Sequence, residues 1–382
     1  MFRLRRLLLH PLAVLGLLHL YAAWRLLGAF PGRPAVQAGI ATFLAASFLL
    51  MPLSMTVRRR GRDLLTSSLA WSGFLVMGLF SSLCVLLLLR DLVLLVLQLA
   101  SSSSPPWWSP YSALLVMALA VTASLVGGVV ARKGVRVREV RIPIEGLPAA
   151  LQGFRIAQIS DIHVGATIGR EFLAGIVGRV NALQADLIAI TGDVVDGTVS
   201  QLRSEVAPLR ELRCAHGSVL VTGNHEYYSG EPEWTREFRA LGIRVLKNQH
   251  LIVERGGGRL LIAGVTDTSA HHFDPAQRSD PRAALRHAPE VGARILLAHR
   301  PASADDAARA GFDLQLSGHT HGGQFWPWNL FVGFFNPYSA GLARHHSMWV
   351  YVNRGTGYWG PPTRLGIPPE ITLLTLVAAG AW

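Results

Sequence analysis

Cysteine is almost absent from this chain of 382 residues, which contains only Cys84 and Cys214. Two cysteines cannot form the framework of several disulfides that stabilises small secreted domains, and they cannot supply a metal site built from thiolates. The composition is consistent with a reducing compartment, and it excludes the disulfide-rich class of proteins.

Acidic residues are scarce in the first third of the chain. Residues 1–141 contain 15 Lys and Arg but only 3 Asp and Glu, whereas residues 142–382 contain 21 of each sign. The net charge of +12 therefore belongs entirely to the first third, which is also the most apolar part. Nucleic-acid binding depends on a basic surface, so the neutral second part argues against a nucleic-acid partner. Basic residues beside long apolar stretches are typical of a membrane anchor.

Four apolar stretches lie in this first part, at about residues 7–30, 35–55, 64–100 and 111–131. A helix needs about 20 apolar residues to cross a bilayer, so each stretch is long enough. The first stretch follows three arginines and could be a signal peptide, but its length and the three further stretches favour a span. A soluble bundle of buried helices is the alternative. We predict about four transmembrane helices.

The third stretch is too long for one simple span. Arg90 and Asp91 interrupt it, and we therefore expect a span over residues 64–89 and an outer or interfacial helix over residues 92–100.

The segments between the apolar stretches alternate in charge. Arginines gather before the first stretch, between the second and third, and after the fourth, whereas SSSSPPWWSPY, between the third and fourth, is uncharged. The positive-inside rule then places both termini in the cytoplasm. We predict a multi-pass protein of the inner (plasma) membrane with a cytoplasmic catalytic domain, and Trp107, Trp108 and Tyr111 at the outer interface.

From about residue 142 the chain has the composition of a globular α/β domain. Apolar runs predict core strands. A helical pattern follows each of the first three strands, near residues 170–183, 202–212 and 232–241. This alternation predicts an α/β fold with largely buried strands. The expected strands are 154–160, 186–191, 218–223, 243–248, 250–255, 259–265, 294–299, 313–318, 348–353 and 370–376.

Polar residues follow five of these strands directly. Ligands of α/β sheets bind beyond the carboxyl ends of the strands, so we expect these side chains to meet at one edge. The glycines beside them, such as Gly192, Gly223 and Gly318, permit tight turns and close backbone approach. The residues are Asp161, His163, Asp193, Asn224, His225, His299, His319 and His321.

These residue types suit metal chemistry. Mixed oxygen and imidazole ligands bind hard or borderline divalent metals, here Mn, Fe, Zn or Co, of which we favour Mn. Eight groups exceed what one ion requires and suit two ions that share a ligand. Two ions about 3.5–4 Å apart clamp a phosphate ester and generate a hydroxide from bound water. A carboxylate bridges two ions more readily than an imidazole does, so Asp193 is the expected bridge.

Five motifs carry a family resemblance. DIHVG, TGDVVDG, TGNHEYY, LLAHRP and SGHTHGG resemble, in this order, the motifs of the calcineurin-like metallophosphoesterase superfamily. The tail, with VNRGTGYWGPP and PPEIT, looks like that of a bacterial membrane-associated branch. That branch includes UDP-2,3-diacylglucosamine pyrophosphatase-like enzymes and proteins that join transmembrane helices to such a domain. The resemblance implies a four-layer α/β sandwich with a binuclear centre over residues 142–382, after a transmembrane region over residues 1–141.

The resemblance also implies roles for the motif residues. His225 would not be a ligand but would stabilise the transition state and help to protonate the leaving oxygen. We therefore predict His225 and Asp161 as catalytic residues. One metal would be held by Asp161, His163, Asp193 and His321, and the other by Asp193, Asn224, His299 and His319.

Five further residues are predicted to bind substrate. Arg300 follows a ligand and Arg354 follows a strand, and either could bind a phosphate bidentately or form a structural ion pair. Phe325, Trp326 and Trp328 open an aromatic run that could be an apolar wall beside the metals, a surface dipping into the bilayer, or a loop packed in the core.

These features predict a membrane-anchored phosphoesterase that hydrolyses a phosphodiester or pyrophosphate bond of a lipid-linked substrate by attack of a metal-bridging hydroxide. Its expected partners are the bilayer and a membrane lipid or lipid-linked phosphate. Two alternatives stay open: the same chemistry on a soluble cyclic nucleotide or phosphoprotein, and a membrane sensor that binds phospholigands without turnover.

Overall fold

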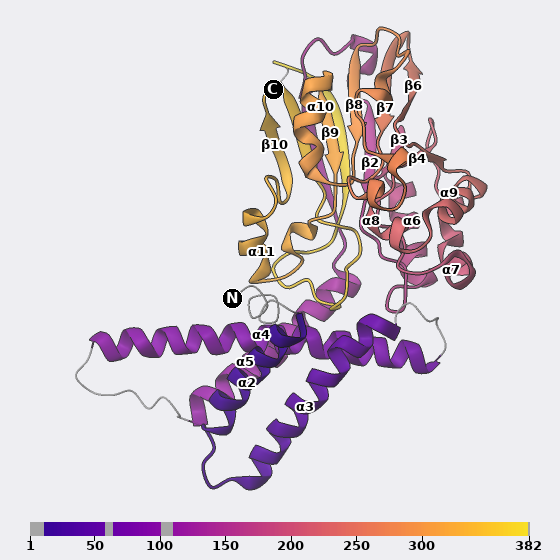
Figure 1. Ribbon diagram of the computed structural model, residues 1–382. Coiled ribbons are helices and arrows are strands. Elements are labelled where there is room, and N and C mark those ends of the chain that lie inside the picture. Colours follow the sequence, from indigo (N-terminus) through magenta and orange to yellow (C-terminus); the bar gives the residue numbers. More distant parts are fainter. Residues whose placement is uncertain (1–10, 58–63, 101–109, 381–382) are drawn as a thin grey trace. The chain divides into compact units, whose positions relative to one another are not determined.

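The computed structural model describes residues 11–57, 64–100 and 110–380 (Figure 1). The basic segments before residue 11 and at 58–63, and the predicted interfacial Trp107 and Trp108, lie outside this part. The chain divides into two compact units. One is Met1–Gly128 with Gly360–Thr363, and the other is Val129–Trp359 with Arg364–Trp382.

The first unit is helical. Within the described residues, three helices are long and apolar enough to cross a membrane, and α2 is a shorter apolar helix of 17 residues. A span needs about 20 residues, so α2 alone falls below that length. The helices are α2 (Pro11–Leu27), α3 (Pro34–Val57), α4 (Leu64–Ala100) and α5 (Pro110–Lys133).

Helix α4 continues without a break through Arg90 and Asp91, so the predicted interruption there is wrong. The two charges have partners on neighbouring helices. Arg90 Nε donates to Ser112 Oγ at 2.9 Å, and Asp91 accepts hydrogen bonds from Tyr21 at 2.8 Å and from Arg25 at 3.0 Å. Charged side chains within apolar helices are tolerated when they pair in this way, and the helix backbone need not end.

The second unit contains two sheets of six strands each. The first has the order β1-β12-β2-β3-β4-β5, in which β2 to β5 run parallel and β12 pairs antiparallel with β2. Its strands are β1 (Arg136–Ile144), β2 (Arg155–Ile159), β3 (Leu187–Ile190), β4 (Ser218–Leu220), β5 (Arg244–Val245) and β12 (Glu370–Ala378).

The second sheet has the order β10-β11-β9-β8-β7-β6, with parallel strands at its centre and an antiparallel pair at each edge. Its strands are β6 (Gln249–Arg255), β7 (Gly258–Gly264), β8 (Ala293–Leu297), β9 (Leu314–Ser317), β10 (Gly341–His345) and β11 (Met348–Val352).

Successive side chains along a strand point to opposite faces of its sheet. Those on one face form a core between the two sheets, and those on the other face form a core with the covering helices. Ile156 and Leu187 of the first sheet pack against Ile262 and Leu297 of the second. Helices cover both outer faces, which makes four layers and confirms the predicted fold class. Helices α6 (Arg170–Ala182), α7 (Val199–Val206) and α9 (Glu231–Ala240) cover the first sheet, and α10 (Ala304–Ala310) covers the second.

Some elements differ from the sequence prediction. Strands β1 and β10 were not expected; β1 contains Arg136, Arg138 and Arg141, and its first part is exposed at a sheet edge. Charges on an edge strand discourage pairing with other chains, but they also hide the strand in the sequence. The helix expected over 202–212 is α7 followed by a 3₁₀ turn, η2 (Ala207–Glu211), which begins beside Pro208.

Candidate metal centre

The loops that follow β2, β3, β4, β8 and β9 bring the predicted metal ligands together. Three groups, each with possible ligand atoms within 4.8 Å of one another, share members. Asp193 belongs to two of the groups and links the two halves of the site. The groups are Asp161, His163 and His321; His163, Asp193 and His225; and Asp193, His299 and His319.

Asp193 lies at the centre of the cluster. Its Oδ2 atom is 3.9 Å from His163 Nε2, 3.9 Å from His225 Nε2 and 3.2 Å from His299 Nε2. A carboxylate that faces both halves of the cluster has the placement that a bridging ligand needs.

Ring nitrogens approach each other closely in both halves. His163 Nε2 is 3.1 Å from His321 Nε2, and His319 Nδ1 is 3.2 Å from His299 Nε2. Imidazoles bind divalent metals at about 2.0–2.1 Å, so neighbouring ligands of one ion lie at roughly this separation. The spacing therefore fits a metal in each half.

Asn224 gives an independent test of the fit. It opens the short helix α8 (Asn224–Tyr228), and its buried Oδ1 atom has no hydrogen-bond partner among the residues that the structure describes. A buried acceptor left without a partner costs about 1–3 kcal/mol. A cation satisfies such an oxygen directly, so the donor set is chemically suited to a metal.

Five of the predicted ligands have left-handed backbone conformations. Their φ angles are 53° at Asp161, 56° at His163, 53° at Asp193, 71° at His319 and 51° at His321. Each costs of order 1–3 kcal/mol in a non-glycine residue, and such conformations concentrate at functional sites. These angles turn the side chains away from the strand direction and toward the cluster.

Two motif glycines are required by close approach. A Cβ atom on Gly223 would lie 2.2 Å from Asp193 Oδ1, and one on Gly318 would lie 2.2 Å from Asp161 Oδ2. No side chain can be accommodated at either position without displacing a carboxylate of the site.

Glu226 holds two of the ligand loops together. Its buried carboxylate accepts hydrogen bonds from the backbone N–H groups of Asp193 at 2.9 Å, Val194 at 2.7 Å and Gly223 at 2.7 Å. Burial, together with the charge of Asp193, raises the pKa of Glu226 to about 7. The carboxylate fixes the loops from which Asp193 and Asn224 project.

Asp196 was not predicted as a site residue, although it lies within the TGDVVDG motif. Asp196 Oδ1 pairs with His225 Nδ1, and Asp196 Oδ2 lies 3.4 Å from His163 Nδ1. Burial opposes ionisation of Asp196, but the charges of His163 and His225 outweigh it and hold the pKa below its ordinary range. A carboxylate behind a histidine sets the orientation of the ring, so Nε2 faces the cluster.

The other charges of the cluster are strongly perturbed. Burial raises the pKa of Asp161. Burial acts in the same direction on Asp193, but His299 and His225 outweigh it and lower the pKa. Burial would lower the pKa of His299, yet Asp193 raises it to about 10. The pKa of His319 falls to about 3 because of burial and the charge of His299. Such shifts are typical of functional sites.

Arg364 is a second supporting residue that was not predicted, and it lies outside the five motifs. It is completely buried and donates hydrogen bonds to the carbonyl oxygens of His321 at 3.1 Å, Arg354 at 2.7 Å and Gly357 at 3.0 Å. Burial lowers its pKa to about 9. The guanidinium ties the turn that carries His321 to a loop more than thirty residues later in the chain.

The predicted substrate residues have diverse surroundings. Arg300 Nε donates to the buried Asp267 at 3.0 Å, and Arg354 Nε lies 3.9 Å from Glu370 Oε2. Phe325 is buried and packs in the domain, Trp326 is half-buried, and Trp328 is exposed. The aromatic run therefore begins inside the domain and ends at its surface.

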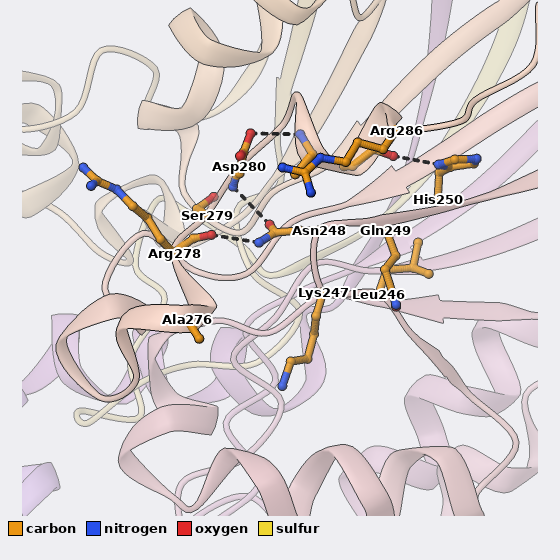
Figure 2. A pocket seen from close by; sticks show the side chains of 12 residues that line it. Leu246, Lys247, Asn248, Gln249, His250, Ala276, Arg278, Ser279, Asp280 and Arg286 are labelled. Carbon is orange, nitrogen blue, oxygen red and sulfur yellow. Dashed lines mark hydrogen bonds between the residues drawn. The ribbon is translucent and has the colours of Figure 1, made fainter.

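A cavity of about 1010 Å³ lies elsewhere in this unit, and none of the predicted site residues lines it (Figure 2). Asn248 shapes its wall: its side chain donates to the carbonyl of Arg278 at 2.8 Å and accepts from the N–H of Asp280 at 3.0 Å. Lys247, also on the wall, pairs with Glu231 at 2.9 Å. The cavity carries none of the metal-binding chemistry described above.

Comparisons with known proteins agree with the geometry. Residues 154–323 match the family described as calcineurin-like phosphoesterase. A transmembrane protein with metallophosphoesterase domain from Danio rerio is 41% identical, over 69% of this chain and 63% of that protein. An uncharacterized metallophosphoesterase from Helicobacter pylori is 35% identical, over 63% of this chain and 64% of that protein. Another from Aquifex aeolicus is 32% identical, over 64% of this chain and 93% of that protein. The matched part of the chain thus covers less than two thirds of the length of the Danio rerio and Helicobacter pylori proteins.

Proposed function

The chain belongs to the calcineurin-like metallophosphoesterase family, and from that premise we propose that it is a membrane-anchored hydrolase of phosphoesters dependent on two divalent metal ions. The observation that carries the proposal is the arrangement of imidazoles and carboxylates on both sides of Asp193. The long apolar helices support anchoring in a membrane, for which we propose the inner (plasma) membrane with the catalytic domain in the cytoplasm.

The residues divide into two ligand sets that share Asp193. We propose that Asp161, His163 and His321 complete one set and that Asn224, His299 and His319 complete the other. Two ions bound here would supply Lewis-acid activation of the phosphate and of the attacking water, and among Mn, Fe, Zn and Co we propose Mn.

His225 is the residue placed to move a proton. Its Nε2 atom faces the cluster, 3.9 Å from Asp193 Oδ2, while its Nδ1 atom pairs with Asp196. The carboxylate of Asp196 stabilises the protonated ring, whose Nε2–H is placed on the side of the cluster, where it would donate to a phosphate oxygen and then to the leaving oxygen. Asp161 accepts two hydrogen bonds from the backbone N–H of His319 at 3.0 Å each, which keeps its carboxylate aimed into the site.

We propose a lipid-linked phosphodiester or pyrophosphate as the substrate. The turn that carries His321 leads within a few residues to the exposed Trp328, so apolar surface adjoins the metal-binding loop. A molecule with a phosphate beside acyl chains would contact both. A UDP-diacylated sugar is the specific test substrate.

The test is hydrolysis by full-length, detergent-solubilised, Mn-loaded protein. UDP-2,3-diacylglucosamine and soluble bis(p-nitrophenyl) phosphate are compared, each also with His225→Ala. We expect release of UMP from the lipid, and a loss of roughly 10²–10⁴-fold in His225→Ala with the metal content unchanged. Turnover of the soluble diester alone would refute the lipid substrate. Turnover of neither, with metal bound, would refute the hydrolase and favour a phospholigand sensor.

A further inference from the structure

Five large apolar side chains stand exposed together on the phosphoesterase unit. They lie on α11 (Trp328–Phe331), on η8 (Val332–Phe334) and directly after it. Phe334 is 80% and Phe335 84% exposed, and no charged residue occurs between residues 322 and 343. Large exposed apolar surfaces mark interaction sites. We call this set the aromatic patch: Trp328, Leu330, Phe331, Phe334 and Phe335.

The segment just before the aromatic patch, residues 323–327, packs against the rest of the unit. We call this segment the base of the patch. A Cβ atom on Gly323 would lie 2.3 Å from the Cα of Asn329, so the loop after His321 presses directly on α11. The backbone N–H of Trp326 donates to the carbonyl of Leu365 at 2.9 Å, and Phe325 is buried beneath. These contacts fix the segment before α11 to the rest of the unit, whereas the five side chains of the patch stay exposed.

A continuous line of contacts joins the base of the patch to the end of α5. Arg132, in the last turn of α5, donates to the carbonyl of Thr167 at 3.1 Å, and the hydroxyl of Tyr358 donates to the same carbonyl at 3.2 Å. The next residue, Trp359, forms two backbone hydrogen bonds with the side chain of Gln324, at 2.8 and 3.0 Å. Gln324 immediately precedes the aromatic run, so the patch and the end of α5 lie on the same side of this unit.

The end of α5 is a rigid part of the unit. Ala131 is completely buried in its core, and only Gly134 and Val135 separate α5 from β1. The carbonyl of Val135 also accepts a hydrogen bond from Arg179 at 2.7 Å. Since α5 is one of the helices that can cross a membrane, this side of the unit carries the end of a candidate membrane span.

We propose that the aromatic patch inserts into the interfacial layer of the bilayer that holds the chain's own helices. Trp and Phe side chains favour this layer, and a charge-free segment enters it without desolvating ions. The partner that we propose is lipid, because a candidate membrane span ends on this side of the unit and would keep lipid close to it. The proposal does not depend on catalysis and goes beyond the proposed function.

The test measures the depth of nitroxide labels on the full chain in nanodiscs of phosphatidylcholine and phosphatidylglycerol. Single cysteines replace Phe334 or Phe335, one at a time, after Cys84 and Cys214 are changed to Ala. Glu254→Cys is the matched control: Glu254 is exposed, and its neighbour Arg255 pairs with Asp186 at the opposite end of β3 from Asp193. Collisions with oxygen and with a water-soluble nickel chelate give the depth of each label.

We expect labels at 334 and 335 to lie about 5–10 Å into the boundary layer, with frequent oxygen collisions and few nickel collisions. The label at 254 should collide freely with nickel. Frequent nickel collisions at both patch positions would place the patch in water and overturn the proposal. Rare collisions with both reagents would mean that protein covers the patch, a second copy or a partner, which also overturns it.

Discussion

Replacing Glu226 by Gln tests whether the carboxylate behind the site holds the metal-binding loops in place. Glu226 Oε2 accepts from the N–H groups of Asp193 and Gly223, and Oε1 accepts from that of Val194. A glutamine of the same shape offers only one oxygen, and its NH₂ group must face at least one of these backbone donors.

The better orientation of the new side-chain amide keeps its oxygen on Asp193 and Gly223 and loses the bonds from Val194 at 2.7 Å and from Val195 at 3.4 Å. Each buried N–H left without an acceptor costs about 1–3 kcal/mol, and the two remaining bonds lose their charge assistance. We therefore expect the loop of Asp193 to shift or loosen. Loss of such a supporting contact typically lowers metal affinity by about 10–100-fold.

The assay is titration of the metal-free full-length protein with Mn²⁺, in which free Mn²⁺ is followed by its paramagnetic resonance signal. Glu233→Gln is the matched control, since Glu233 is exposed in the first turn of α9. Binding of two Mn²⁺ ions by Glu226→Gln with the affinity of the unaltered protein would show that the carboxylate does not position the ligands.

Three further predictions concern the same centre. Asn224→Ala should lower the Mn²⁺ stoichiometry measured by elemental analysis from two toward one, because a buried oxygen ligand is removed; retention of both ions would exclude Asn224 as a ligand. Gly318→Ala should abolish binding of at least one ion, since the new Cβ would overlap Asp161, whereas Gly333→Ala, with open space around it, should bind normally; equal affinities would contradict the packing argument. The pKa of His299 is about 10 in the metal-free protein, so a metal must displace its proton at neutral pH. Affinity should therefore rise with pH by about tenfold per unit for each proton released, as calorimetry in two buffers would show, and a pH-independent affinity would refute this.

Local sequence patterns were sufficient for much of the architecture. The apolar runs around residues 154–160 and 186–191 form the buried strands β2 and β3. A continuous apolar run places apolar side chains on both faces of a strand, and both are removed from water only in a sheet that is covered on both faces. The length and hydropathy of the segments that form α3, α4 and α5 likewise predicted helices able to cross a membrane. Strand β1 was not, because its arginines resemble the basic flank of a membrane helix as much as an edge strand.

The candidate site divides in the same way. Each motif lies at the end of one strand, so the residue types and their spacing could be recognised along the chain and metal chemistry inferred from them. Of the supporting residues, Arg364 could not be recognised in this way. Arg364 lies 43 positions after His321, and only the folded loop brings its guanidinium onto the His321 carbonyl.

Some properties depend only on near neighbours in the chain and could be predicted from it: which segments form strands, which are long enough to cross a membrane, and which side chains are chemically suited to bind metals. The folded structure was needed to identify the carboxylate that pairs with His225, the residue that holds the loop of Asp193, and the surface position at which the aromatic run ends. These features could not be predicted because hydrogen bonding and burial depend on distances between residues far apart in the chain, and the packing of the two sheets sets these distances.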